Sequence, residues 1–189
     1  RANGINESGQ VVITGVDTEC NWHSLVWDNG QVTDIAGVSG RRTTGNAINN
    51  AGLVTGSTQF TRPMHAYVYA LDGAWTDIGA LGSGETSEGF AINNLGQVAG
   101  YSYGSSGNVT SRGFIWQIGG MTDLGTLGGN RTIAWDLNDY GQVVGESYLA
   151  DGRTGAFIWQ NGVMENLGVL DSGNTRAYGI NNRGQAVGS

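Results

Sequence analysis

The sequence predicts an all-β protein, a β-propeller or a fragment of one, built from four-stranded repeats of about 44 residues in four copies plus a half. Three observations support this prediction. Two hairpin motifs alternate along the chain. Glycine supplies 34 of the 189 residues while proline occurs once, a composition typical of many tight turns. Apolar residues occur on both faces of the expected strands. We expect under about a tenth of the residues to be helical, because two hairpins fill each repeat.

The first motif reads Ile-Asn, two further residues, Gly, then Gln or Leu and an apolar pair. Its copies begin at Ile5, Ile48, Ile92, Leu137 and Ile180, so that the asparagines lie 43, 44, 45 and 43 residues apart. In the last copy Asn181 can bond backbone groups two residues on, and Gly184 stands where a left-handed residue closes a bulged turn. The motif therefore predicts a β-hairpin.

The second motif lies between copies of the first and consists of an apolar run, a turn and a strand containing Asp or Asn. Its runs are 24–27, 66–69, 113–116 and 156–159, and the polar residues that follow are Asp34, Asp77, Asp123 and Asn166. The pairs Asn29-Gly30 and Asn161-Gly162 are strong signals for a short hairpin turn. Two hairpins give four strands per repeat, as in a propeller blade.

The apolar runs indicate sheets that are buried on both faces. In 157–159 and 143–144 apolar side chains point to both sides of the strand instead of alternating with polar ones. Blades stacked between neighbours have this property, whereas a flat β-solenoid, the competing architecture, usually has shorter repeats with fewer hairpin turns. We expect one aromatic column to pack between blades and Phe114 and Phe157 to be largely buried as well. The column is Trp27, Tyr69, Trp116 and Trp159.

We expect residues 1–189 to form a single repeat domain. The repeats are approximately 5–47, 48–91, 92–136 and 137–179, with a half repeat at 180–189. Unpaired sheet edges rarely stay exposed. We therefore expect residues 1–16 to pair with the last hairpin of the same chain or with another chain, unless the sequence is excised from a longer repeat protein.

The composition excludes some classes of partner. Lysine is absent, and nine arginines face sixteen carboxylates for a net charge of −7, which disfavours nucleic acid and anionic lipid. No apolar run approaches the roughly 18 residues of a membrane span, so we expect no membrane insertion. The single cysteine, Cys20, cannot form an intramolecular disulfide.

The motifs resemble those of a known family. Ala-Phe-Ile-Trp at 156–159, Met-Thr-Asp-Leu-Gly-Thr-Leu-Gly-Gly at 121–129 and Ala-Ile-Asn-Asn-Leu-Gly-Gln-Val-Ala-Gly at 91–100 resemble the HAF-repeat family of extracellular bacterial proteins. The resemblance covers essentially the whole chain. It departs at Tyr69 and Leu53, and at 37–40, which replaces the usual Leu-Gly-Gly. It implies secretion or surface exposure in a bacterium and transfers no catalytic or binding residue.

The candidate binding residues lie where the repeat is least regular. Loops between the hairpins vary in length and carry aromatics outside the packed column, and such loops on a rigid frame commonly bind ligands. The candidates are Trp22, Tyr101, Tyr103, Tyr148 and Arg153. Aromatic rings beside polar groups suit sugars, which stack an apolar face and hydrogen bond through hydroxyls. Packing at the blade ends is the equally weighted alternative.

We therefore expect an extracellular binding module for carbohydrate or a cell-surface polymer. The first alternative is a structural protein that assembles end to end through its terminal hairpins, and the second is a polysaccharide hydrolase or lyase. No nucleophile motif is present, although Asp136, Asp139, Glu146 and Asp151 could converge as hydrolytic carboxylates.

Calcium is the one cofactor that the repeated carboxylates suggest. It would require the repeated carboxylates of Asp34, Asp77 and Asp123 to point into a central channel. The favoured reading of these residues is structural, as acceptors of backbone hydrogen bonds beside turns.

Overall fold

The computed structural model describes residues 1–35, 42–58, 64–82, 86–104, 111–168 and 173–189. Blade 1 comprises β1 (Ala2–Ile5), β2 (Val11–Val16), β3 (Trp22–Asp28) and β4 (Gln31–Asp34). Blade 2 comprises β5 (Thr43–Ile48), β6 (Val54–Thr58), β7 (His65–Tyr69) and β8 (Trp75–Gly79). Blade 3 comprises β9 (Thr86–Ile92), β10 (Val98–Tyr103), β11 (Arg112–Gln117) and β12 (Gly120–Asp123). Blade 4 comprises β13 (Gly128–Leu137), β14 (Val143–Leu149), β15 (Thr154–Gln160) and β16 (Val163–Gly168), and a half blade comprises β17 (Ala177–Ile180) and β18 (Ala186–Gly188).

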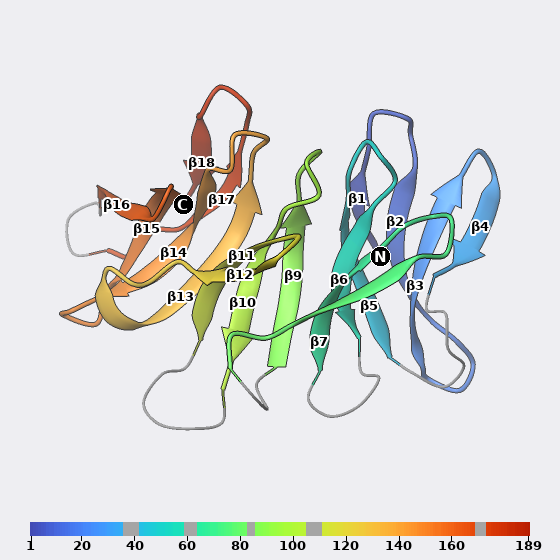
Figure 1. Ribbon diagram of the computed structural model, residues 1–189, viewed down its shortest axis with the longest axis horizontal. Helices are drawn as coiled ribbons and strands as arrows, with labels where there is room; N and C mark the ends of the chain where they lie inside the picture. Colours follow the sequence, from blue (N-terminus) through green and yellow to red (C-terminus); the bar gives the residue numbers. More distant parts are fainter. Residues whose placement is uncertain (36–41, 59–63, 83–85, 105–110, 169–172) are drawn as a thin grey trace.

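Each blade is an antiparallel meander in which every strand pairs with the next along the chain. The blades follow one another in sequence order, from blue to red in Figure 1, and the first strands of successive blades contact one another. These first strands therefore form the inner edge of the array. The described residues contain no helix, which confirms the all-β prediction.

The inner ends of the blades are joined by the asparagine of the first motif. Asn93 Oδ1 accepts hydrogen bonds from the backbone N–H groups of Leu95 and Gln97, as predicted for the turn, at 3.1 and 2.9 Å. Its Nδ2 donates across to the carbonyl oxygen of Asn138 in blade 4, at 3.0 Å. Asn6, Asn49 and Asn138 each make the same bond to the next copy. The repeated asparagine thus shapes its own turn and ties neighbouring blades together.

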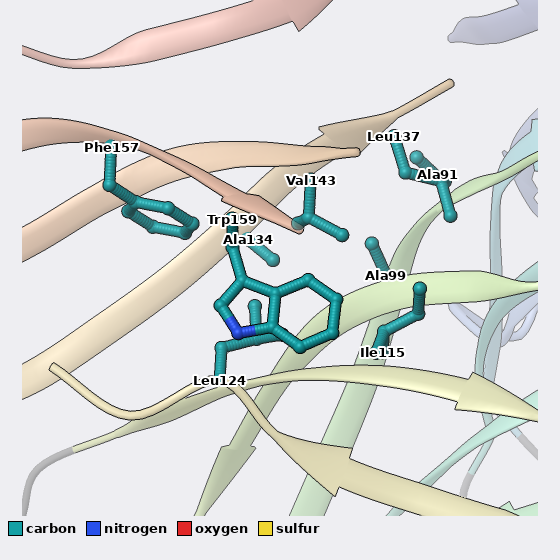
Figure 2. Close-up of a cluster of buried hydrophobic side chains, with 9 residues drawn as sticks. All are labelled: Ala91, Ala99, Ile115, Leu124, Ala134, Leu137, Val143, Phe157 and Trp159. Atoms are coloured by element: carbon teal, nitrogen blue, oxygen red, sulfur yellow. The ribbon is translucent and has the colours of Figure 1, made fainter. Parts of the chain in front are cut away.

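The apolar columns fill the spaces between blades. Phe114, Phe157 and Trp159 are buried, as predicted. Figure 2 shows the Trp159 indole among Val143 of its own blade and side chains of blade 3 that include Ala99 and Ile115. Tyr69, Trp116 and Trp159 each pack against residues of the preceding blade.

Two members of the column differ from the prediction. Trp116 is only partly buried, although it packs against the cluster that contains Ile92 and Val98. Trp27 is exposed, because it lies on the face of blade 1 that points away from blade 2 and no described blade covers that face.

The predicted pairing of residues 1–16 with the last hairpin of the same chain is wrong. Strand β2 already pairs with β3 inside blade 1, and β17 with β18 forms a separate two-stranded sheet. The reason is the phase of the repeat: blades begin a few residues before each first motif, so the N-terminal hairpin belongs to a complete blade. Pairing between chains stays a prediction.

Candidate functional site

The turns of all five first-motif copies converge at one end of the array. They line an open hollow of about 450 Å³. Its lining consists of the Ile or Leu, the Asn and the following residue of each copy: Ile5, Asn6, Glu7, Ile48, Asn49, Asn50, Ile92, Asn93, Asn94, Leu137, Asn138, Asp139, Ile180, Asn181 and Asn182. This axial hollow has a polar rim, because the third residue of each triplet is an amide or a carboxylate.

The rim residues are hydrogen bonded from blade to blade. The backbone N–H of Asn50 donates to Asn94 Oδ1 at 3.0 Å, and the N–H of Asn94 donates to Asp139 Oδ1 at 2.8 Å. Burial disfavours the charged form of Asp139, but hydrogen bonds from Asn94 and from Asn182 outweigh it and lower the pKa of the carboxyl. The rim is therefore a fixed array of polar groups.

Each first strand also carries a β-bulge at one position, three residues before the motif asparagine. The ladder skips one residue there in every copy, and these bulged residues are Asn3, Asn46, Phe90, Trp135 and Tyr178. A bulge redirects a side chain out of the alternating pattern and is common beside functional sites. The bulged residues thus form a row that runs across the inner strands.

The bulged residues are amides in the first two blades and aromatics in the following sheets. Asn3 Nδ2 donates to the carbonyl oxygen of Gly45 at 2.6 Å, and Asn46 Nδ2 donates to that of Gly89 at 2.9 Å. In the later blades aromatic contacts replace these amide bonds, with ring centroids 4.8 Å apart for Phe90 and Trp135 and 6.1 Å apart for Trp135 and Tyr178. Phe90 also stacks on Tyr101 at 5.5 Å. Tyr178 is the last of the five bulged residues in this sequence, and half of its side chain is exposed.

A carboxyl lies beside the start of the aromatic row. Glu88 accepts hydrogen bonds from Asn46 Nδ2, at 3.1 Å, and from the Tyr101 side chain. Burial raises the pKa of Glu88, and these hydrogen bonds only partly oppose the shift. Burial, together with the charge of Glu88, also raises the pKa of Tyr101.

Two arginines share one buried carboxylate further along. Arg131 Nη2 lies 3.3 Å from Glu146 Oε1, and Arg176 Nε lies 2.5 Å from Glu146 Oε2. Arg131 also reaches Tyr148, with Nη1 3.2 Å from the hydroxyl and the guanidinium carbon 5.5 Å from the ring centroid. We name the whole group the axial cluster: Glu88, Phe90, Tyr101, Arg131, Trp135, Glu146, Tyr148, Arg176 and Tyr178.

The raised pKa of Glu88 predicts a pH-dependent effect of substitution. The folded state binds the Glu88 proton more tightly than the unfolded state does, so this group's contribution to stability falls as the pH rises from the unfolded pKa through the folded one. Glu88→Gln keeps an oxygen acceptor for Asn46 and cannot ionise. We expect it to be more stable than the wild type at pH 7 and to lose this advantage near pH 4, as measured by urea unfolding at both values. The exposed Glu165→Gln is the control, and equal differences at the two pH values would refute the assignment.

The structure brings together only part of the binding set predicted from the sequence. Tyr101 and Tyr148 belong to the axial cluster. Trp22 begins β3, Tyr103 ends β10, and both are exposed. Arg153 pairs with Asp151 in the turn before β15, at 2.7 Å.

Sequence reasoning did not assign Glu88, Phe90, Arg131, Arg176 or Tyr178 to the site, whereas Trp135 stands out in the sequence as an aromatic outside the packed column. The available signal was position: aligning the repeats places Asn3, Asn46, Phe90, Trp135 and Tyr178 at one point of the motif. That column mixes amides with aromatics and so escapes a search for recurring residue types.

The carboxylates considered for calcium lie in the outermost strands β4, β8 and β12, away from the inner strands that line the axis. Asp77 Oδ1 accepts a hydrogen bond from Gly79 N at 2.8 Å, and Asp123 Oδ1 accepts one from Gly125 N at 2.9 Å. Asp34 contacts His23 at 2.7 Å. These strands do not place the three carboxylates around the axis, and Asp77 and Asp123 accept backbone hydrogen bonds beside turns. Within the described ranges no group of three His, Cys, Asp or Glu side chains is placed to hold a metal ion.

The four carboxylates weighed for hydrolysis serve separate partners. Asp136 accepts backbone hydrogen bonds from Leu137 and Ile180. Asp139 accepts a hydrogen bond from Asn94 in the rim, Glu146 binds the two arginines and Asp151 binds Arg153.

Among the residues that the structure describes, no helix is long and apolar enough to cross a bilayer.

Comparison with known proteins places the fold. The chain matches TolB from Acinetobacter baumannii with a TM-score of 0.61 and 17% identity, over 85% of this chain and 40% of that one. It matches a gluconolactonase from Xanthomonas campestris with a TM-score of 0.50 and 15% identity, over 93% of this chain and 68% of that one. Both are β-propellers, so the class of protein is a β-propeller-like repeat protein, and the chain spans less than half of the TolB length.

Comparison with family models and with curated proteins yields no match. The resemblance to the HAF-repeat family therefore stays a prediction.

Proposed function

We propose that this chain is an extracellular binding module for carbohydrate or a cell-surface polymer, and that the axial cluster is its ligand site. The row of bulged aromatics that ends in the half-exposed ring of Tyr178 carries the proposal. Sugar rings stack on aromatic faces while polar neighbours bind their hydroxyls. Extracellular placement is supported by the family resemblance alone.

The framework supports binding with little conformational change. Aromatic stacking and the asparagine bonds tie the inner strands of neighbouring blades together. A site held in this way loses little conformational entropy when a ligand binds. The proposal shifts the site from the variable loops, where the sequence placed it, to the inner strands.

Titration of tryptophan fluorescence with a panel of soluble glycans tests the proposal, because Trp135 contacts Tyr178. We expect Tyr178→Ala to weaken binding by up to about tenfold, since one aromatic contact is worth about 0.5–1.5 kcal/mol. Tyr103→Ala is the matched control, because Tyr103 is equally exposed at 50% and lies outside the axial cluster.

The control also separates the two placements of the site. Loss of binding in Tyr103→Ala alone would move the site to the loops. An absence of binding to every neutral and acidic glycan tested would overturn the proposed function.

A structural role by end-to-end assembly is the second candidate, favoured by apolar side chains exposed on the first and last described sheets. Trp27 and Val32 are exposed on the outer face of blade 1, and β18 presents an exposed edge at Val187. Apolar surfaces and open strand edges of this kind promote association. Light scattering over a dilution series tests it, and a monomer at every concentration would exclude it.

A further inference from the structure

We infer that the glycan bound by the axial cluster is acidic, carrying carboxylates as in a uronic acid polymer. This inference rests on the proposed function and names the class of its ligand. It follows from which charged groups of the axial cluster face solvent and which are buried.

Within the cluster, the Glu146 carboxylate is buried and the guanidinium groups of Arg131 and Arg176 are partly exposed. The side chain of Glu146 is 4% exposed, whereas those of Arg131 and Arg176 are 33% and 40% exposed. A ligand that approaches this surface therefore meets guanidinium groups before it meets Glu146.

Glu146 pairs with two arginines, although the charge of one would neutralise its carboxylate. One guanidinium can neutralise a buried carboxylate through paired hydrogen bonds, yet each oxygen of Glu146 pairs with a different arginine. A guanidinium has five N–H donors in a planar fork that matches a carboxylate. The trio of Arg131, Glu146 and Arg176 thus carries a net positive charge.

The cations lie beside the rings of the cluster. Arg131 lies over the Tyr148 ring, and Arg176 directly precedes β17, which carries Tyr178. A ligand that offers an apolar face for a ring and a carboxylate for an arginine satisfies both groups at once. A sugar acid has both features in one residue, whereas a neutral sugar offers the arginines no charge beyond that of Glu146.

The second carboxyl of the cluster, Glu88, and the neighbouring Asp136 both bond to protein groups. Glu88 is bonded by Asn46 and Tyr101, and Asp136 accepts the backbone N–H groups of Leu137 and Ile180. The net charge of −7 opposes an anionic ligand at long range. At physiological ionic strength that repulsion is screened beyond about 8 Å, so the local arginines dominate at contact.

The test compares two forms of one polymer, polygalacturonate and its fully methyl-esterified form, which differ in the charge of the carboxyl group. We expect the wild type to bind the acidic form at least about tenfold more tightly in calorimetry at 0.15 M salt, because its carboxylate can accept a charge-assisted hydrogen bond. Raising the salt concentration should weaken binding of the acidic form only.

Arg176→Gln is the main variant, because Glu146 keeps Arg131 as a partner and the fold is expected to persist. It should weaken binding of the acidic polymer far more than binding of the esterified one, so that most of the preference for the acidic form is lost. Arg153→Gln, outside the cluster, is the control and should retain the wild-type preference.

The failures of the two proposals can be told apart. Equal binding of both polymers by the wild type, or an unchanged preference in Arg176→Gln, would refute the acidic ligand and leave the glycan-binding function standing. Binding of neither polymer nor any other glycan would refute both.

Discussion

Replacing Phe157 by alanine is expected to lower the free energy of unfolding by about 3–5 kcal/mol. The side chain is fully buried and packs in the cluster that joins blades 3 and 4 with Trp159, Leu124 and Ala134. Its ring has no route to solvent, so truncation removes apolar burial and leaves a cavity in rigid surroundings. Urea unfolding followed by circular dichroism measures the loss.

The control for this experiment is Val163→Ala, an apolar truncation at an exposed position of β16, which should change stability by less than about 0.5 kcal/mol. The place of Trp116 in the aromatic column by itself predicts a cost of about 3–5 kcal/mol for Trp116→Ala. Because Trp116 is only partly buried, its loss should now cost less than that of Phe157. A Phe157→Ala protein as stable as the wild type would mean that the blades do not pack through this cluster.

The hairpins and the column between blades could be predicted from sequence because their determinants are local and repeated. The turn around Asn93 depends on residues within four positions of it, and the place of Trp159 follows from a run that is apolar on both faces. Both features recur with the period of the blade. The repetition therefore made the hairpins and the packing between blades predictable from the sequence.

The axial cluster could not be predicted in this way, because it depends on contacts between repeats. Phe90, Trp135 and Tyr178 come together through three successive blades, at separations of 45 and 43 residues. No local sequence pattern predicts the bulge. The bulged position is occupied by Asn3 and Asn46 in the first two blades, so it shows no recurring aromatic residue. Tyr101 was found as an aromatic outside the column, while its partner Glu88 gave no signal in the sequence.

In blades 2, 3 and 4 the second strand carries a glycine opposite the residue that precedes the bulge. These glycines are Gly56, Gly100 and Gly145. A Cβ at Gly145 would overlap the carbonyl oxygen of Ile133 and approach the Phe157 ring to 2.9 Å. Gly56 and Gly100 face the corresponding carbonyls of Thr44 and Glu88 in their own blades. In blades 2, 3 and 4 the glycine thus accommodates the close approach of the inner strand and does not serve a turn, whereas Ile13 occupies the equivalent position of blade 1.

We therefore expect Gly145→Ala to destabilise the protein by about 1–3 kcal/mol or more, the usual cost of forcing extra atoms into a packed site. Relief of the overlap requires β13 to move away from β14, which displaces the bulged Trp135, so glycan binding should weaken together with stability. Gly179→Ala is the control: a Cβ there meets Val187 at 3.4 Å, an ordinary contact, at a backbone angle open to any residue. Thermal unfolding and the fluorescence titration measure the two effects. If Gly145→Ala were as stable as Gly179→Ala, the bulge would not be the reason for the glycine, and the axial cluster would lack the rigid support on which its proposed function depends.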